Sequence, residues 1–399
     1  MQSAKTLQAL IRERGKKGRP LERVYRMLFN PELYLIAYAK LYGNEGALTP
    51  GTTGETVDGM SLNKVKAIIE LLRYERYRWS PARRVYIPKK NGKKRPLGIP
   101  PWSDKLLQEV MRMLLSAYYE PKFADCSHGF REGRGPHTAL RDIQERWAGT
   151  SWFLEGDIKG CFDHVDHQVL LDILARDIRD NWFLRLVKSM LEAGYMEEWR
   201  YNTTFSGTPQ GGVVSPLLAN VYLNELDQYV NRTLIPKWTK GNRRRKNTEY
   251  YRLKLQERQL RKKGRKEEAK AARKESQKLP SVDIKDEGYR RLRYVRYADD
   301  YLLGFVGSKA EAEEIKEGIG TFLRDHLKLE QSQEKTLVTH ARTQRARFLG
   351  YEVGLHPIHR TSGSSQLSNT LYLSGLKLGW RQVAQAGVQP LLVIDRLNE

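Results

Sequence analysis

Two adjacent aspartates, Asp299 and Asp300, occur within the largely apolar stretch 292–306. The residues on either side favour β-strands, so the pair is predicted at the tip of a β-hairpin. Aspartate is an ordinary turn residue, and turn formation is the default explanation for such a pair. Here Tyr297 and Tyr301 crowd the pair from both sides, and the glycine or asparagine that is usual in a tight turn is missing. Turn formation therefore explains the pair poorly, and a chemical role is favoured.

A third carboxylate, Asp157, ends another predicted strand of the buried type, residues 152–158. If the strand ends are neighbours, the three carboxylates form a hard site of oxygen ligands that suits Mg²⁺. Two such ions about 3.5–4 Å apart hold an attacking 3′-hydroxyl and a leaving pyrophosphate in line, lower the pKa of the hydroxyl and neutralise charge on the α-phosphate. The three aspartates therefore predict a site for divalent metal ions, of a kind that can carry out nucleotidyl transfer.

The segment before Asp157 is predicted to contain helices and a second hairpin. The first 75 residues read as helices interrupted by a Gly/Thr-rich loop, and residues 104–119 form another helix. Residues 83–95 alternate in polarity and turn through Asn-Gly, which is a strong hairpin signal. In the first of these regions, the apolar positions expected on one helix face are Leu33, Ile36, Ala37 and Leu41.

Two further helices are predicted after Asp157. One begins at Asp166, and the other covers residues 215–230. In the second helix, Ser215 is expected to be the N-cap and Pro216 the first helical residue. Its apolar face is expected to contain Leu218, Tyr222, Leu226 and Tyr229.

The composition indicates the class of partner. The net charge is +23 and the isoelectric point is about 9.8, which favours a polyanion, because each Lys or Arg set on a phosphate releases a condensed counterion. Only two cysteines occur, too few for a disulfide framework or for paired CxxC zinc sites. The sequence contains no run of eighteen apolar residues, so no membrane span is predicted.

Much of the excess charge lies in residues 231–278, which contain 19 Lys or Arg against 5 Glu, a net of +14. This segment has too few apolar residues to form a core of its own. We therefore expect an inserted, largely solvated arm that is either helical or disordered. RNA binding is the favoured role of this arm. A charged linker without a role is the alternative.

Four blocks of the sequence resemble motifs of the reverse transcriptases encoded by group II introns, in the order of that family. Tyr297-Ala298-Asp299-Asp300 is similar to the YxDD motif of the family. The resemblance covers roughly residues 30–355. The other blocks are 127–134, which resembles the fingers motif but has Glu132 where proline is usual, 207–220, which resembles the template- and nucleotide-contacting motif, and 348–351, which resembles the block that closes the palm.

The resemblance implies a role for each matching position. Phe162 falls where an aromatic steric gate excludes ribonucleotides, although packing beside a strand would also explain it. Lys335 resembles a lysine proposed to protonate the leaving pyrophosphate. The catalytic residues implied by the resemblance are Asp157, Asp299 and Asp300. The metal-binding positions are the same three aspartates and Ile158. The nucleotide-binding residues are Lys89, Arg95, Arg83, Gln210 and Phe162.

The expected architecture is α+β, with the fingers and palm of a right-hand polymerase and a palm formed by an antiparallel sheet with helices on one face. Fewer than 50 residues follow Tyr351, so the thumb is expected to be lost or diverged. The expected divisions are a helical N-terminal extension at 1–75, fingers at 76–150, a palm at 151–355 with a basic insertion at 231–290, and an atypical tail at 356–399.

The resemblance implies an RNA-dependent DNA polymerase that uses two Mg²⁺ ions, or Mn²⁺, with a maturase role in splicing. Its expected partners are the host intron and template RNA, a DNA primer and dNTPs, and its expected location is the bacterial cytoplasm in preference to an organelle. A catalytically weak or inactive RNA-binding maturase that assists intron folding is the alternative. Retron and diversity-generating reverse transcriptases are a lesser alternative.

Overall fold

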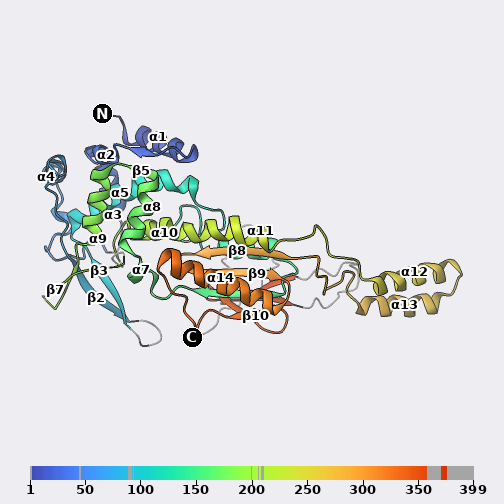
Figure 1. Ribbon diagram of the computed structural model, residues 1–399. Coiled ribbons are helices and arrows are strands. Elements are labelled where there is room, and N and C mark those ends of the chain that lie inside the picture. Colours follow the sequence, from blue (N-terminus) through green and yellow to red (C-terminus); the bar gives the residue numbers. More distant parts are fainter. Residues whose placement is uncertain are drawn as a thin grey trace.

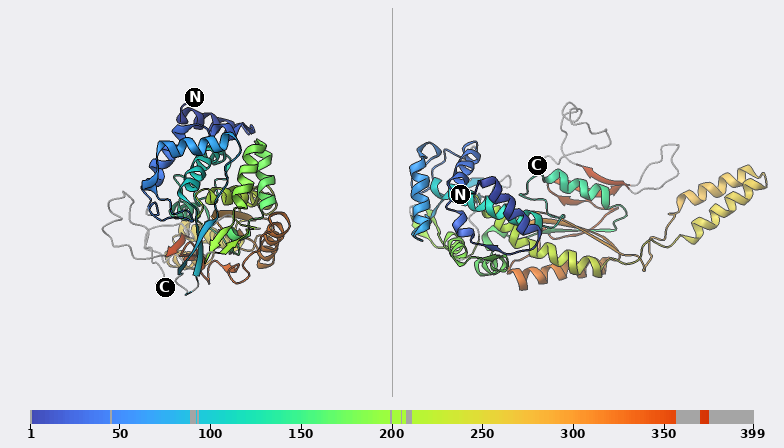
Figure 2. Two further views of the ribbon diagram at one scale, coloured as in Figure 1. Left: turned by 90° about the vertical axis from the view of Figure 1, so that its left-hand side faces the viewer. Right: turned by 90° about the horizontal axis from the view of Figure 1, so that it is seen from above.

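A central antiparallel sheet forms the middle of an elongated molecule, with helices at one end and a helical hairpin projecting from the other (Figures 1 and 2). The computed structural model describes residues 2–44, 46–88, 92, 94–198, 200–204, 206–207, 211–356 and 370–374. No helix in these ranges is both long and apolar enough to cross a membrane.

The central sheet has the strand order β10-β4-β9-β8 and is antiparallel throughout. Its strands are β4 (Trp152–Asp157), β8 (Arg291–Tyr297), β9 (Asp300–Val306) and β10 (Val338–His340). The predicted strand before Asp157 and the predicted hairpin around Asp299 are thereby confirmed. The pairing β4–β9 brings the two predicted carboxylate sites to the same end of the sheet.

One face of the central sheet is covered by α10 (Ser215–Tyr229) and α14 (Lys309–Leu327). The alternating side chains Tyr301, Leu303 and Phe305 of β9 point into this larger core. The opposite face packs against α6 (Pro136–Arg146) through Val295 and Leu302. Helices were predicted on one face of this sheet, and α6 covers the second face as well. A second sheet adjoins this core, with the strands β11 (Ala346–Phe348), β12 (Tyr351–His356) and β13 (Thr370–Ser374).

Helices dominate the N-terminal end, where α5 (Trp102–Tyr119) is buried along most of its length. The predicted hairpin is present as β2 (Ala82–Pro88) and β3 (Lys94–Ile99), within a sheet of order β3-β2-β6-β7. The remaining elements of this region are α1 (Ala4–Lys16), β1 (Leu21–Glu22), α2 (Val24–Met27), α3 (Pro31–Tyr42), η1 (Val57–Gly59), α4 (Leu62–Arg73), η2 (Glu120–Lys122), α7 (Cys161–His164), α8 (His167–Asp177), β5 (Ile178–Arg179), α9 (Asn181–Leu191), β6 (Tyr195–Glu197) and β7 (Arg200–Asn202).

Two details of the predicted helices differ from the structure. In α3 the buried residues are Leu33, Tyr34, Ala37 and Leu41, whereas Ile36 is exposed. In α10 the N-cap position is Val214, one residue earlier than predicted, and Ser215 is already helical and buried. The helix predicted from Asp166 is present as α8, and the Asp166 side chain caps it by accepting a hydrogen bond from the Val169 amide.

The basic segment forms two helices, α12 (Thr248–Lys262) and α13 (Lys266–Lys278), that pack against each other away from the rest of the molecule (Figure 2). Ala269 and Ala272 form part of the contact between the two helices. The chain reaches this arm from α10 through η3 (Val230–Leu234) and α11 (Ile235–Lys237). The helical form of the predicted arm is therefore confirmed.

Candidate active site

The turn between β8 and β9 presents the two adjacent aspartates. Tyr297 pairs with Asp300 across the hairpin, so that Ala298 and Asp299 form the two-residue turn. Ala298 has a φ of 56°, in the left-handed region that favours glycine. The turn thus has the backbone that a two-residue hairpin requires, although its residues are not the usual ones for that conformation.

Asp157 lies opposite Asp300 in the register of β4 and β9. Burial, together with the charge of Asp157, raises the pKa of Asp299 above its ordinary value. Burial, followed by the charges of Asp299 and Asp157, raises the pKa of Asp300 to about 7. The three carboxylates are therefore close enough to repel one another, and a bound cation would relieve that repulsion.

Lys335 lies next to this group of carboxylates. Its Nζ is 3.0 Å from Oδ1 of Asp157, and the resulting hydrogen bond raises the pKa of the lysine. The preceding residues are held against the end of β4, because Ser332 donates its amide hydrogen to the Asp157 carbonyl and Gln331 forms a bridge with Ile158. The structure therefore places a positive charge at the predicted metal site.

The three aspartates suit a hard divalent ion, since they offer carboxylate oxygens. Within the described ranges, no three His, Cys, Asp or Glu side chains are spaced to hold a metal ion as they stand. The ammonium of Lys335 bonds Oδ1 of Asp157, so it competes with a metal ion for this oxygen. The Ile158 side chain is a hydrocarbon without a donor atom, so a metal ion could bind this residue only through its main-chain oxygen.

The hairpin β2–β3 contains the predicted nucleotide-binding cations. The charge of Arg95, on β3, is felt at Asp299, whose pKa it acts to lower. Arg83 lies four residues along β2 from Ile87, the register partner of Arg95, a separation of about 13 Å. Its guanidinium donates to the Pro50 carbonyl at 3.1 Å. The structure thus associates Arg95 with the carboxylates and Arg83 with the preceding loop, while Lys89 lies outside the described residues.

Phe162 is on α7, five residues after Asp157, and its ring meets Phe130 edge to face at 6.1 Å. Gly207, at the start of the predicted nucleotide-contacting motif, donates its amide hydrogen to the Val165 carbonyl just after α7. Gly211 lies so close to Gly98 of β3 that a Cβ would stand 2.4 Å from the Gly98 oxygen. The motif therefore connects the α7 side of the site with the hairpin, although Gln210 lies outside the described residues.

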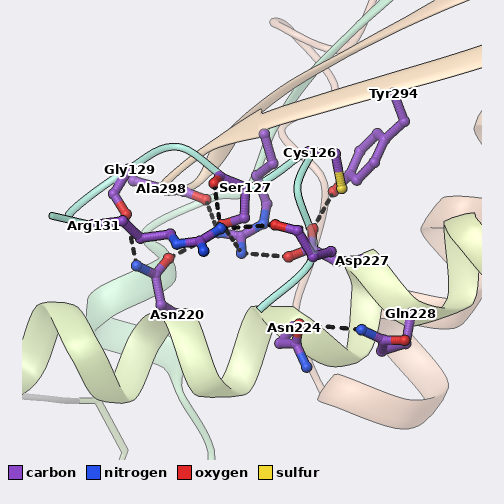
Figure 3. Close-up of polar contacts among 12 residues, drawn as sticks. Cys126, Ser127, Gly129, Arg131, Asn220, Asn224, Asp227, Gln228, Tyr294 and Ala298 are labelled. Atoms are coloured by element: carbon purple, nitrogen blue, oxygen red, sulfur yellow. Dashed lines mark hydrogen bonds and ion pairs between the residues drawn. The ribbon is translucent and has the colours of Figure 1, made fainter. Parts of the chain in front are cut away.

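A buried polar network behind the turn was missed by the sequence analysis (Figure 3). At its centre Arg296, fully buried, forms an ion pair with the equally buried Asp227 of α10 at 2.6 Å. Burial acts to lower the pKa of Arg296, but the Asp227 carboxylate more than reverses this, and the pKa lies above its ordinary value. A signal was present in the sequence, since alternation places Arg296 on the same face as Leu292 and Tyr294.

Comparison with known proteins identifies the family of this arrangement. The family model described as reverse transcriptase (RNA-dependent DNA polymerase) matches residues 87–353, which include all three aspartates. The chain belongs to the reverse transcriptase family. Members of this family generally use divalent metal ions, in agreement with the carboxylate ligands described above.

Several relatives of this reverse transcriptase belong to introns. It is 46% identical over 339 residues to the group II intron-encoded protein LtrA of Lactococcus lactis subsp. cremoris, covering 83% of this chain and 56% of LtrA. It is 40% identical over 328 residues to a 91 kDa protein in the cob intron of Schizosaccharomyces pombe, covering 82% of this chain and 40% of that protein. These matches place it in the group II intron-encoded branch of the family.

A relative of similar length is the protein YkfC of Escherichia coli, which is 34% identical over 333 residues that cover 80% of each chain. The chain spans about half the length of LtrA and a smaller part of the Schizosaccharomyces pombe protein.

Proposed function

We propose that this chain is the RNA-directed DNA polymerase of a group II intron, which adds dNTPs to the 3′-hydroxyl of a DNA primer on an RNA template. The observation that carries the proposal is the convergence of Asp157, Asp299 and Asp300 at one end of the central sheet, within a chain of the reverse transcriptase family. Carboxylates that crowd together, so that the pKa values of Asp299 and Asp300 are raised, are suited to hold the cations of nucleotidyl transfer.

The metal ligands in this proposal are Asp157, Asp299, Asp300 and the main-chain oxygen of Ile158. When bound, two Mg²⁺ ions, for which Mn²⁺ can substitute, would lower the pKa of the 3′-hydroxyl and neutralise charge on the α-phosphate. A cation bound at Asp157 would displace the Lys335 ammonium from Oδ1. The freed ammonium would be available to donate a proton to the leaving pyrophosphate.

The nucleotide would be held between the hairpin β2–β3 and α7. In this assignment Arg95 grips the triphosphate with a bidentate fork and Lys89 adds a point charge. Gln210 contacts the nascent base pair, and Phe162 presses on C2′ of the incoming sugar. Arg83 contributes to the same surface from farther along the hairpin, a weaker assignment because its guanidinium already bonds the Pro50 carbonyl.

The divisions expected from the sequence correspond to this assignment. Residues 1–75 would form a helical extension and residues 76–150 the fingers, with the hairpin β2–β3 extending over the site. Residues 151–355 would form the palm, with an insertion at 231–290 that contains the arm. The tail at 356–399 is the position at which a diverged thumb would begin.

Binding of the host intron, as in a maturase role, is the second part of the proposal. Its support is the arm, whose two helices carry exposed lysines and arginines and bury little against the rest of the chain. A surface of this kind suits the RNA backbone, because most of its binding free energy would come from counterion release.

The decisive experiment is primer extension on an RNA template with Mg²⁺, comparing dNTPs with NTPs. Extension with dNTPs and little extension with NTPs would support the polymerase. Tight, salt-dependent RNA binding without any extension would instead identify a non-catalytic maturase, and the proposal of polymerase activity would be withdrawn.

A further inference from the structure

The buried Arg296 donates hydrogen bonds to five acceptor atoms at once. The residues that supply these acceptors are labelled in Figure 3. Its Nε and Nη2 donate to the two oxygens of Asp227 at 2.8 and 2.6 Å. Its Nη1 donates to the Asn220 side chain at 3.1 Å and to the Ala298 carbonyl at 2.8 Å. Nη2 also donates to Oγ of Ser127 at 2.9 Å. One guanidinium therefore connects α10, the turn of the β8–β9 hairpin and the loop that precedes α6.

The contact with the Ala298 carbonyl bears directly on the site. Ala298 is the turn residue with a left-handed backbone, and the peptide that contains its carbonyl leads into Asp299. A hydrogen bond from a charged group to this carbonyl fixes the orientation of that peptide. The direction in which the Asp299 carboxylate leaves the turn is thereby tied to Arg296.

The loop 126–131 closes the other side of the turn. The Arg296 amide donates to the Cys126 carbonyl at 2.8 Å, and the His128 amide donates to the Arg296 carbonyl at 2.9 Å. Gly129 approaches the turn so closely that a Cβ would lie 2.3 Å from the Ala298 nitrogen. Asn220 holds this approach by donating to the Gly129 carbonyl at 2.7 Å. The turn is thus enclosed on two sides by groups that Arg296 also contacts.

Stability alone does not account for such a network. A buried ion pair loses so much hydration that apolar residues of the same volume often serve stability equally well. What the ion pair supplies here is direction, since a planar guanidinium with donors on every side can hold several acceptors in one geometry. A lysine has its donors on a single nitrogen and cannot reach the same set.

We propose that Arg296 is a positioning residue, which with Asp227 holds the Ala298 carbonyl so that the Asp299 and Asp300 carboxylates are set for cation binding. This inference rests on the proposed function, because it concerns the same three aspartates. The role is distinct from catalysis, since Arg296 is buried behind the turn and contacts no reacting group.

Two variants separate positioning from folding. Arg296→Lys keeps the charge beside Asp227 but loses the fork that reaches Ala298. The double variant Arg296→Met with Asp227→Leu removes both charges, so that neither is left buried and unpaired, and it also loses the contact with the turn. Leu33→Ala is the control, because Leu33 is fully buried in α3, at the N-terminal end of the molecule and away from the turn, so its truncation costs stability without touching the network.

Electron paramagnetic resonance measures Mn²⁺ binding and so tests the carboxylates directly, and primer extension at saturating dNTP measures kcat. The Mn²⁺ that the parent binds but Asp299→Asn does not is taken as the Mn²⁺ bound at the carboxylates. We expect both Arg296 variants to bind that Mn²⁺ about 10- to 100-fold more weakly and to lose a similar factor in kcat. KM for the dNTP should stay within about twofold of the parent, because the hairpin is untouched, and Leu33→Ala should match the parent in all three measurements.

The inference is overturned if folded Arg296→Lys binds Mn²⁺ and extends primers as Leu33→Ala does. Should the double variant fail to fold, thermal melting will show it, and Arg296→Lys decides alone. A parent that binds Mn²⁺ but does not extend primers would contradict the proposed function. The weaker Mn²⁺ binding of the Arg296 variants would still test the positioning role in that case.

Discussion

Asp157 and Asp300 lie opposite each other on the neighbouring strands β4 and β9, and Asp299 occupies the turn next to this pair. Strand pairing thus brings together carboxylates from two segments that are more than 140 residues apart in the sequence. The strand pairing sets the spacing between Asp157 and Asp300, whereas Asp299 depends on the conformation of the turn.

Asp299→Asn should abolish primer extension, lowering kcat by about 10³-fold or more, because a metal-ligand charge is lost. RNA affinity, measured by filter binding, should remain within about twofold of the parent. Asp325→Asn, at an exposed position of α14, is the matched control and should extend normally. Retained polymerisation in Asp299→Asn would remove the central claim about these carboxylates.

Lys335 can act in two ways that different measurements separate. If its ammonium only competes with the cation for Asp157, Lys335→Gln should tighten Mn²⁺ binding and leave kcat nearly unchanged. If it also protonates pyrophosphate, kcat should fall by about 10²-fold or more at saturating metal. We expect both effects, tighter Mn²⁺ binding together with lower kcat. An unchanged kcat would leave Lys335 as an ion-pair partner of Asp157 only.

Phe162→Ala should admit ribonucleotides more readily, because the ring would no longer press on C2′ of the sugar. The ratio of kcat/KM for dNTP to that for NTP should fall by about tenfold or more, within the range that a single apolar contact provides. Phe130→Ala removes the ring packed edge to face on Phe162 and should give a smaller fall. An unchanged ratio in a folded Phe162→Ala protein would return this residue to ordinary packing.

His128 should make the protein sensitive to mild acid. Burial, followed by the charges of Arg134 and Arg131, lowers the pKa of His128 to about 4. The Thr138 hydroxyl donates its proton to the Gly135 carbonyl, so it accepts from Nδ1 of His128. The buried Nε2 of His128 has no hydrogen-bond partner within the described residues. The native state therefore holds the neutral ring.

The consequence for stability follows from proton linkage. The unfolded state binds the extra proton below about pH 6.5, whereas the native state resists it until about pH 4, so the free energy of unfolding falls as the pH drops through that window. The loss attributable to His128 is at most about 3 kcal/mol. Urea titrations at each pH should show a flatter dependence for His128→Asn, which keeps a donor for Thr138, and no flattening for His326→Asn at an exposed position. Parallel curves for the parent and His128→Asn would contradict this assignment.

Local sequence patterns predict most of the elements around the site, for a physical reason. The strands β4 and β9 are strongly apolar, and β8, despite its three arginines, and the helix α5 keep apolar residues at regular spacing, so the type of each element depends little on distant contacts. Ile36 shows where the pattern fails, since α3 turns Tyr34 towards the core in its place. A pattern of apolar residues specifies a face only to within one neighbouring position.

The arrangement around the carboxylates was less accessible from the residues alone. The pairing of β4 with β9 is a long-range contact that local patterns do not predict. The inference that Asp157 and Asp299 belong to one site depended on the family resemblance. The role of Arg296 depends on which helix covers β8, because only the approach of α10 supplies Asp227 as its partner. A charged residue on the buried face of a predicted strand was the available signal, and the position of its counter-ion was not.

Removal of the arm should weaken RNA binding while leaving the fold intact. The arm can be excised cleanly because its two ends meet. Lys246 pairs with Val282, and the Asn247 amide donates to the Ser281 carbonyl at 3.2 Å. Replacing residues 248–280 by two glycines would close the chain as a short hairpin at that point. The excised segment contains twelve Lys or Arg and five Glu, a net charge of +7.

If phosphate contacts by these charges drive binding, the slope of log K against log[salt] should become shallower by between about 1 and 6 when the arm is removed. A second variant keeps the helices but removes four positive charges by replacing the exposed Lys262, Lys263, Lys270 and Lys274 with Gln, and it should reduce the slope by part of the same amount. A short primer–template at saturating concentration and low salt should still be extended, because the arm projects away from the carboxylates (Figure 1). Loss of extension under those conditions, in a folded protein, would make the arm part of the grip on the primer–template. An unchanged affinity and slope in both variants would show that the arm is a solvated appendage without an RNA-binding role.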